Sequence, residues 1–257
     1  MSNRNLSSNH QRFEEIDILR GVALILMLIY HFLFDLTYLE LVNISLDTTF
    51  WKLIARSSLI IFLLLVGIGI SLKAQKETLY RKNKVNLFKT FFSKGIIIFA
   101  LALLISITTK LITGDLYVRF GVLHLIAVSL IIFFPLRHFK KINLLISSII
   151  IILSLLSSSI TVQTSFFLSL GLTPVNFVSV DYVPFFPWSA VILIGIFLGN
   201  ILYKNHSRQF SLFKICSHSL VKKLSCNGRQ SLVIYLVHQP IIIVVLMIFK
   251  LLFIKEI

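Results

Sequence analysis

Seven long runs of apolar residues, separated by shorter polar connections, dominate the chain. Each run comes close to the roughly 20 residues that an α-helix needs to cross the hydrocarbon core of a bilayer. The first run lacks a small-residue cleavage site and is rich in Leu and Phe to its end, which is typical of a retained helix and not of a signal peptide. The pattern predicts an all-α polytopic bundle of about seven transmembrane helices. The predicted spans are Ile16–Leu39, Leu53–Leu72, Gly95–Thr113, Tyr117–Leu136, Ile142–Thr161, Phe185–Tyr203 and Ser231–Phe249.

The composition excludes a soluble domain. Of the 257 residues, 57% are hydrophobic and only 14% are charged, and the mean hydropathy is +0.93. Soluble domains are nearer half apolar and a quarter charged. The whole chain, residues 1–257, is therefore predicted to be one membrane domain, in which residues 1–15 form a cytoplasmic N-terminal segment. The two cysteines, Cys216 and Cys226, are too few for a disulfide framework and are expected to stay reduced.

The basic residues predict the orientation in the membrane. The net charge is +15, and the connections after the second, fourth and sixth runs hold sixteen of the 25 Lys and Arg residues. In the other three connections, Lys52 is the only basic residue. Because Lys and Arg next to spanning helices stay in the cytoplasm, we expect an inside N-terminus and an outside C-terminus in the cell (inner or plasma) membrane. Topology thus accounts for most of the charge, and nothing indicates a nucleic-acid partner.

The first predicted helix carries a stripe of four ionisable residues. Asp17 and Arg20 are three residues apart and His31 and Asp35 are four apart, so each pair can touch. Eleven residues separate Arg20 from His31, which places them on one face with a rise of roughly 16 Å. Ionisable side chains are costly within a bilayer and usually mark a functional site. An ion pair at the helix start and a buried hydrogen bond between His31 and Asp35 are the structural alternative.

The last predicted helix places Tyr235 and His238 on one face, above Arg229 at its inner mouth. Pro240 removes a helix hydrogen bond beside His238 and should kink the helix. Further candidates lie toward the outer side, where a long connection, Val162–Pro184, is expected to fold back on the bundle because apolar loops are disfavoured in water. They are Arg56, Arg119, His124, Asp181 and Trp188. No set of His and Asp has metal-ligand spacing, so no metal is expected.

Four ordered segments resemble the heparan-alpha-glucosaminide N-acetyltransferase catalytic-domain family, and the resemblance covers essentially the whole chain. The segments are Ile16–Asp35 with Arg20 and His31, Phe120-Gly-Val-Leu-His124-Leu, Asp181-Tyr-Val-Pro-Phe-Phe-Pro-Trp188 and Gly228-Arg-Gln-Ser-Leu-Val-Ile-Tyr-Leu-Val-His238-Gln-Pro240. Membrane acyltransferases that O-acetylate surface polysaccharides share the Arg-then-His pattern of the first helix. The resemblance implies transfer of an acyl group, usually acetyl, from cytosolic acyl-CoA to a glycan or sugar outside the membrane.

The polar residues can be assigned to this chemistry. Guanidinium groups suit the phosphates of CoA, and roughly 16 Å of helix is about the reach of its pantetheine arm. His31 is the expected general base, oriented by Asp35, whereas direct transfer and an acyl-His intermediate both remain open. The expected acyl-CoA-binding residues are Arg20, Asp17, Arg229, Tyr235 and His238. The expected acceptor-binding residues are Arg56, Arg119, His124, Asp181 and Trp188.

Two other functions use the same features. A transporter or flippase for a lipid or sugar would use the polar stripe as a translocation path, and inverted repeats with broken helices would favour it. The chain could instead be a non-catalytic membrane partner, which would keep the fold without the catalytic activity. Acetyl-CoA hydrolysis or CoA binding by the purified protein discriminates between these hypotheses. Membrane lipids, acyl-CoA and a glycan or sugar acceptor are the expected partners, and a homo-oligomer is possible.

Overall fold

The computed structural model describes residues 13–79, 83–157, 160–211 and 219–253, most of them in α-helices. Five helices are long and apolar enough to cross a membrane. This confirms the predicted all-α polytopic fold. These helices are α1 (Glu14–Tyr38), α2 (Thr49–Leu79), α3 (Lys84–Thr113), α6 (Phe185–Leu202) and α8 (Ser231–Phe253).

The remaining elements are short. Three are α-helices, three are short 3₁₀ helices, and two very short strands form an antiparallel hairpin after α6. They are α4 (Val122–Ile132), α5 (Lys141–Ser157), α7 (Ser219–Arg229), η1 (Gly114–Leu116), η2 (Pro135–His138), η3 (Ser165–Leu170), β1 (Tyr203–Lys204) and β2 (Ser207–Arg208).

The fourth predicted span, Tyr117–Leu136, is much shorter as a helix, since α4 covers only Val122–Ile132. Before α4, the backbone of Leu116 and Phe120 accepts hydrogen bonds of 2.8 Å from Val180 and Val183. These residues pair with another segment and cannot join the helix. After α4, Pro135 opens a 3₁₀ turn. The apolar pattern therefore found the buried segment but overestimated its helical length.

The third helix is longer than its predicted span, because α3 begins at Lys84 and not near Gly95. The side chain of Asn83 caps its first turn by accepting a hydrogen bond from the Val85 amide at 3.1 Å. No Gly or Pro interrupts residues 84–94. Hydropathy reports the part of a helix that suits lipid, whereas capping and breaking residues set where the helix starts.

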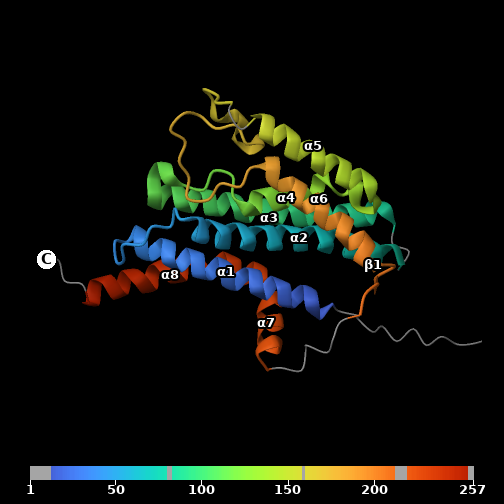
Figure 1. Cartoon of the computed structure of the whole chain (residues 1–257), viewed down its shortest axis with the longest axis horizontal. Coiled ribbons are helices and arrows are strands. Elements are labelled where there is room, and N and C mark those ends of the chain that lie inside the picture. Colours follow the sequence, from blue (N-terminus) through green and yellow to red (C-terminus); the bar gives the residue numbers. More distant parts are fainter. Residues whose placement is uncertain (1–12, 80–82, 158–159, 212–218, 254–257) are drawn as a thin grey trace, which may run out of the picture. The chain divides into compact units, whose positions relative to one another are not determined.

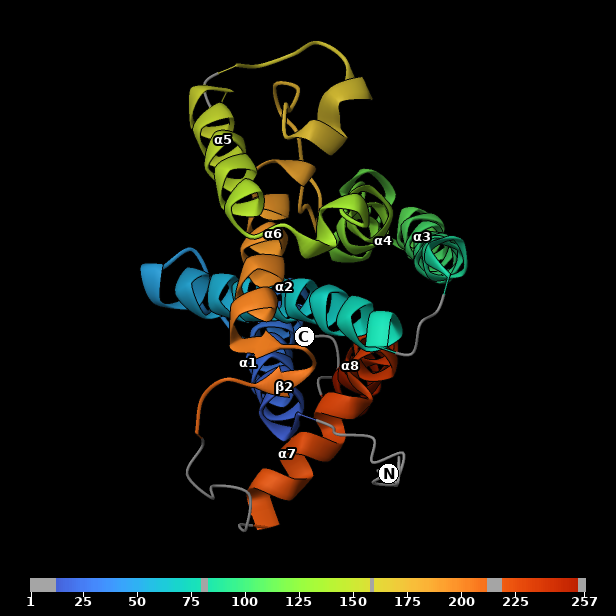
Figure 2. The ribbon, with the colours of Figure 1, turned by 90° about the vertical axis from the view of Figure 1, so that its right-hand side faces the viewer.

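The described chain forms two compact units. The first unit comprises residues 1–62 and 212–257, and in its described part α1 packs against α7 and α8 (Figure 1). The second unit comprises residues 63–211, where α3 packs against α4 and α5 against α6 (Figure 2). Helix α2 contributes its first part to one unit and the rest to the other.

Glycines form the seam between α2 and α6 within the second unit. A Cβ atom on Gly67 would lie 2.1 Å from the Ile192 carbonyl oxygen, and one on Gly195 would lie 2.3 Å from the Leu64 carbonyl oxygen. Neither position can carry a side chain without moving the backbone. Small residues let helix backbones approach closely, which is a common mode of packing in membrane proteins.

The long connection between α5 and α6 folds back within the second unit, as expected. Besides the bonds from Val180 and Val183, the Ser179 hydroxyl donates to the Tyr117 carbonyl at 2.8 Å. The Tyr182 hydroxyl donates to the Leu168 carbonyl in η3 at 2.7 Å. These bonds satisfy backbone and hydroxyl groups that would otherwise be exposed among apolar side chains. They hold Asp181 next to the start of α4.

Candidate functional site

The charged residues at the start of α1 form one cluster with Arg229 in the first unit. The carboxylate of Asp17 receives Arg20 Nη1 at 3.3 Å and Arg229 Nε at 3.5 Å. The Asp17 side chain is only 4% exposed, whereas those of Arg20 and Arg229 are 30% and 44% exposed. One buried carboxylate thus holds two guanidinium groups that stay partly exposed.

Two glycines bring the helices of this cluster together. A Cβ atom on Gly228 would lie 1.8 Å from the Asp17 carbonyl oxygen, and one on Gly21 would lie 2.4 Å from the Leu224 carbonyl oxygen. Because neither glycine has a side chain, the end of α7 touches the first turns of α1. This contact sets Arg229 beside Asp17, 212 positions away in the sequence.

His31 is held by its own helix. Its Nδ1 atom lies 2.9 Å from the carbonyl oxygen of Met27, one turn earlier in α1. A carbonyl oxygen can only accept a hydrogen bond, so Nδ1 carries the proton and Nε2 presents a lone pair. The side chain is half-buried. The hydrogen bond therefore leaves Nε2 unprotonated, which a proton acceptor requires.

The hydrogen bond expected between His31 and Asp35 is not formed. In the described structure, the Asp35 carboxylate receives the side-chain amide of Gln239 instead, with Nε2 at 2.7 and 3.0 Å from its two oxygens. Asp35 is 2% exposed. The amide in α8 reaches both carboxylate oxygens, while the Met27 carbonyl already occupies His31 Nδ1. Asp35 therefore fixes α8 to α1 and does not bond the imidazole.

A second histidine faces His31 from α8. The rings of His31 and His238 lie edge to face, with centroids 5.0 Å apart and planes at 85°. The Nδ1 atom of His238 lies 2.7 Å from the Tyr235 carbonyl oxygen, so it also carries the proton. His238 Nε2 is buried and has no hydrogen-bond partner in the described structure. The Tyr235 ring lies 5.6 Å from His238 and stacks on Phe62 at 6.2 Å.

The first unit thus contains all seven residues expected to bind acyl-CoA or to act in catalysis. They form two groups along α1, with Asp17, Arg20 and Arg229 at its start and His31, His238, Tyr235 and Asp35 farther on. Gln239 was not predicted as a site residue. The sequence feature that could have identified Gln239 is a polar amide side chain within a predicted spanning helix, directly between His238 and Pro240. Arg56 lies in α2, exposed, and no ion pair with another described residue holds it.

In the second unit, Asp181 and His124 bond to the first turn of α4. The Asp181 carboxylate accepts the Val122 amide at 3.4 Å, where the positive end of the helix dipole favours an anion. Burial raises the pKa of Asp181 to about 6, and the Val122 bond opposes that rise. Nδ1 of His124 accepts the Gly121 amide at 3.3 Å, and its ring packs 5.5 Å from those of Phe99 and Phe120.

Arg119 and Trp188 complete the predicted set in the second unit. The Arg119 guanidinium lies over the rings of Tyr117 and Phe177, at 4.8 and 5.4 Å from their centroids. Stacking of this kind orients a cation without neutralising it. Trp188 is half-buried in the first turns of α6. Cys226 is exposed in α7 and free, whereas Cys216 lies outside the described residues.

The sequence was compared with known families, curated proteins and solved structures. The family model described as "Heparan-alpha-glucosaminide N-acetyltransferase, catalytic" matches residues 12–240, which include α1, α4, α6 and the histidine of α8. The comparisons with curated proteins and with solved structures give no match. The family match covers most of the chain and agrees with the resemblance of the four segments. The chain belongs to the heparan-alpha-glucosaminide N-acetyltransferase catalytic-domain family.

Proposed function

We propose that this chain is an integral membrane acyltransferase of the cell (inner or plasma) membrane. It moves an acetyl or other acyl group from cytosolic acyl-CoA to a hydroxyl or amine of a glycan or sugar outside the membrane. The family membership supports acetyl transfer in general. The observation that carries the proposal for this chain is the imidazole of His31, whose proton is held on Nδ1 by the Met27 carbonyl.

The cluster at the start of α1 binds the phosphates of acyl-CoA. Arg20 and Arg229 both reach the carboxylate of Asp17, and their side chains remain 30% and 44% exposed. Guanidinium groups bind phosphate through paired, charge-assisted hydrogen bonds. From Arg20 the α-helix rises roughly 16 Å to His31, which suits the length of a pantetheine arm running along α1. Tyr235 and His238 line the thioester end of that arm.

His31 acts as the general base. Its Nε2 lone pair takes the proton from the acceptor hydroxyl or amine as the oxygen or nitrogen attacks the thioester carbon. The new C–O or C–N bond forms, the C–S bond breaks, and the proton passes from Nε2 to the departing thiolate, which leaves as CoA–SH. No charge is left behind on the protein. The nearby His238 ring excludes water and bounds the space in which the acyl carbon reacts.

The acceptor side is assigned to the outer residues. Arg119 and Trp188 present a stacked cation and an aromatic ring, which suit hydroxyl groups and sugar faces, and Arg56 offers a further exposed cation. Asp181 and His124 bond to the first turn of α4, and they support acceptor binding by fixing the segment that carries Arg119.

The test is acetyl transfer by the purified full-length protein in nanodiscs. Labelled acetyl-CoA is supplied with a panel of amino sugars and oligosaccharides, and both labelled glycan and free CoA are measured. Thr37→Ala is the matched control for His31→Ala, because Thr37 lies on the same helix and donates to its own turn at Leu33. We expect transfer in the wild type and in Thr37→Ala, and its loss in His31→Ala. The absence of CoA binding and of transfer in all three would overturn the proposal.

A further inference from the structure

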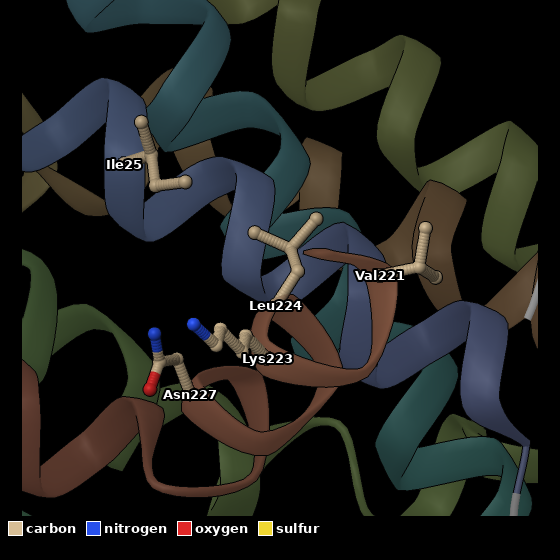
Figure 3. A pocket seen from close by; sticks show the side chains of 5 residues that line it. All are labelled: Ile25, Val221, Lys223, Leu224 and Asn227. Carbon is tan, nitrogen blue, oxygen red and sulfur yellow. The ribbon is translucent and has the colours of Figure 1, made fainter. Parts of the chain in front are cut away.

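A shallow pocket of about 310 Å³ lies between α1 and α7 within the first unit (Figure 3). It is separate from the facing rings of His31 and His238. Three apolar residues and two polar ones surround it. They are Ile25, Val221, Lys223, Leu224 and Asn227.

The pocket arises from the way the two helices pack. At Gly228 and Gly21 the backbones of α7 and α1 are in direct contact, since a Cβ atom at either position would meet a carbonyl oxygen. Beyond this contact, Ile25 and Val221 carry branched side chains that cannot pack as closely. The pocket lies beside these two side chains, on the side of Leu224, Lys223 and Asn227.

The polar side of the pocket carries an ammonium and a side-chain amide, and each of them supplies N–H donors. The Lys223 ammonium and the Asn227 amide point to the same side (Figure 3). Within the described chain, no carboxylate forms an ion pair with Lys223, and Lys222 next to it is also exposed. An ammonium with an adjacent amide N–H suits an anion with several acceptor oxygens, such as a phosphate.

One of the three apolar residues of the pocket belongs to a helix that can span a membrane, whereas Val221 and Leu224 lie in α7. Ile25 lies in α1, one of the helices long and apolar enough to span the bilayer, and is 46% exposed. Helix α7 follows α6 in a strongly basic connection, which the positive-inside rule assigns to the cytoplasm. The pocket thus combines an exposed apolar residue of a helix that can span the bilayer with an ammonium on a segment predicted to be cytoplasmic.

We propose that this pocket binds an anionic phospholipid of the inner leaflet. Lys223 and Asn227 hold the headgroup phosphate, and an acyl chain runs along Ile25 and Leu224. Basic pockets beside spanning helices on the cytoplasmic side are suited to anionic headgroups. The phosphates of acyl-CoA share this chemistry, but an exposed Ile25 on a helix long and apolar enough to span the bilayer favours a lipid chain over a nucleotide.

The test measures lipid retention and needs no acyltransferase activity. The full-length protein is exchanged into detergent with phosphatidylglycerol or phosphatidylcholine, and bound lipid is quantified by native mass spectrometry. Lys223→Gln should weaken phosphatidylglycerol binding about fivefold, the effect of one lysine near an anionic surface. Asn227→Asp should weaken it further by placing a negative charge at the phosphate. Lys222→Gln is the matched control and should change binding less than twofold.

Three results would overturn the proposal. One is equal loss of phosphatidylglycerol in Lys223→Gln and Lys222→Gln. Another is equal retention of phosphatidylcholine and phosphatidylglycerol by the wild type. The third is displacement of the lipid by acetyl-CoA together with weaker CoA binding in Lys223→Gln, which would make acyl-CoA the ligand. A protein that binds the lipid but does not transfer acetyl would count against the acyltransferase function and not against the lipid pocket. Failure of one proposal can therefore be told from failure of the other.

Discussion

The side-chain amide of Gln239 donates to both carboxylate oxygens of Asp35, at 2.7 and 3.0 Å, joining residues 204 positions apart. The pair ties α8 to α1 one turn beyond His31 and directly after His238. Because His238 and Gln239 are consecutive, a shift of α8 that broke this pair would also move the second imidazole. Asp35 is thus a positioning residue in the proposed site, acting on His238 through Gln239.

Loss of Gln239 should destabilise the protein. In Gln239→Leu the carboxyl group of Asp35 would be buried without its donor, which costs about 2 kcal/mol. Thermal unfolding in detergent measures the change. Gln230→Leu is the control, since Gln230 is an exposed glutamine just before α8. Equal unfolding temperatures for the two variants would show that the pair does not stabilise the helix junction.

Replacement of the proposed base should affect the chemical step. His31→Ala should lower kcat by roughly 100- to 10,000-fold, the usual contribution of a general base, and leave CoA binding within about twofold. Asp35→Asn should cause a smaller loss, because the Met27 carbonyl still orients the imidazole. Steady-state kinetics with acetyl-CoA separate kcat from KM. A well-folded His31→Ala enzyme with full activity would contradict the mechanism and make His238 or His124 the candidate base.

The arginine cluster should determine CoA affinity. Arg20→Ala removes charge-assisted hydrogen bonds to phosphate and should weaken CoA binding about tenfold or more, with a smaller effect in Arg20→Lys. Calorimetric titration with CoA gives the dissociation constants of Arg20→Ala and Arg20→Lys. Arg56→Ala serves as the control, because this exposed arginine lies outside the Asp17 cluster. Unchanged affinity in Arg20→Ala would remove Arg20 from the proposed phosphate site.

Asp181 should make stability depend on pH. Burial raises its pKa from 3.8 to about 6 in the folded protein, so the folded state holds this proton more tightly than the unfolded state. The resulting stability is fully present below about pH 3.8 and is lost as pH rises through about 6. Asp181→Asn should therefore raise the unfolding temperature relative to the wild type at pH 7, and this gain should shrink toward pH 4. A gain that does not vary with pH would contradict the assignment.

The predicted orientation can be tested with single cysteines. In a Cys216→Ser background, Cys226 in α7 should react with a membrane-impermeant maleimide only after the membrane is permeabilised. Val175→Cys in the same background, with Cys226→Ser added, should react in intact cells, since Val175 is 72% exposed in the connection before α6. Labelling of Cys226 from outside would reverse the topology. Activity should survive replacement of both cysteines, because neither belongs to the proposed site.

The local sequence pattern correctly predicted features that involve a single helix. The apolar runs located the spanning helices, and helical spacing placed Asp17 beside Arg20. Hydrogen bonds between segments far apart in the sequence could not be predicted from the local pattern. Nothing in the local pattern shows that the backbone of Phe120 bonds to the segment after Asp181, which is why α4 is shorter than its apolar run.

The partners of Asp35 and Asp17 depend on three-dimensional packing as well. The i,i+4 spacing permits a bond between His31 and Asp35, but a donor from α8 satisfies the carboxylate, and spacing alone cannot reveal such a competitor. Helix α7 was also missed, because its high content of Lys and polar residues resembles a cytoplasmic loop. Its close approach to α1 at Gly228 and at Gly21 gives that segment a defined place.

The group that orients the His31 imidazole is part of the main chain. Every amino acid at position 27 supplies the same carbonyl oxygen, so no substitution of Met27 deletes the acceptor, provided that α1 stays helical through this turn. The side chain of Met27 packs in the buried core, so its size matters for packing, but it does not decide which nitrogen of His31 carries the proton. What decides it is the unbroken helical backbone from residue 27 to residue 31.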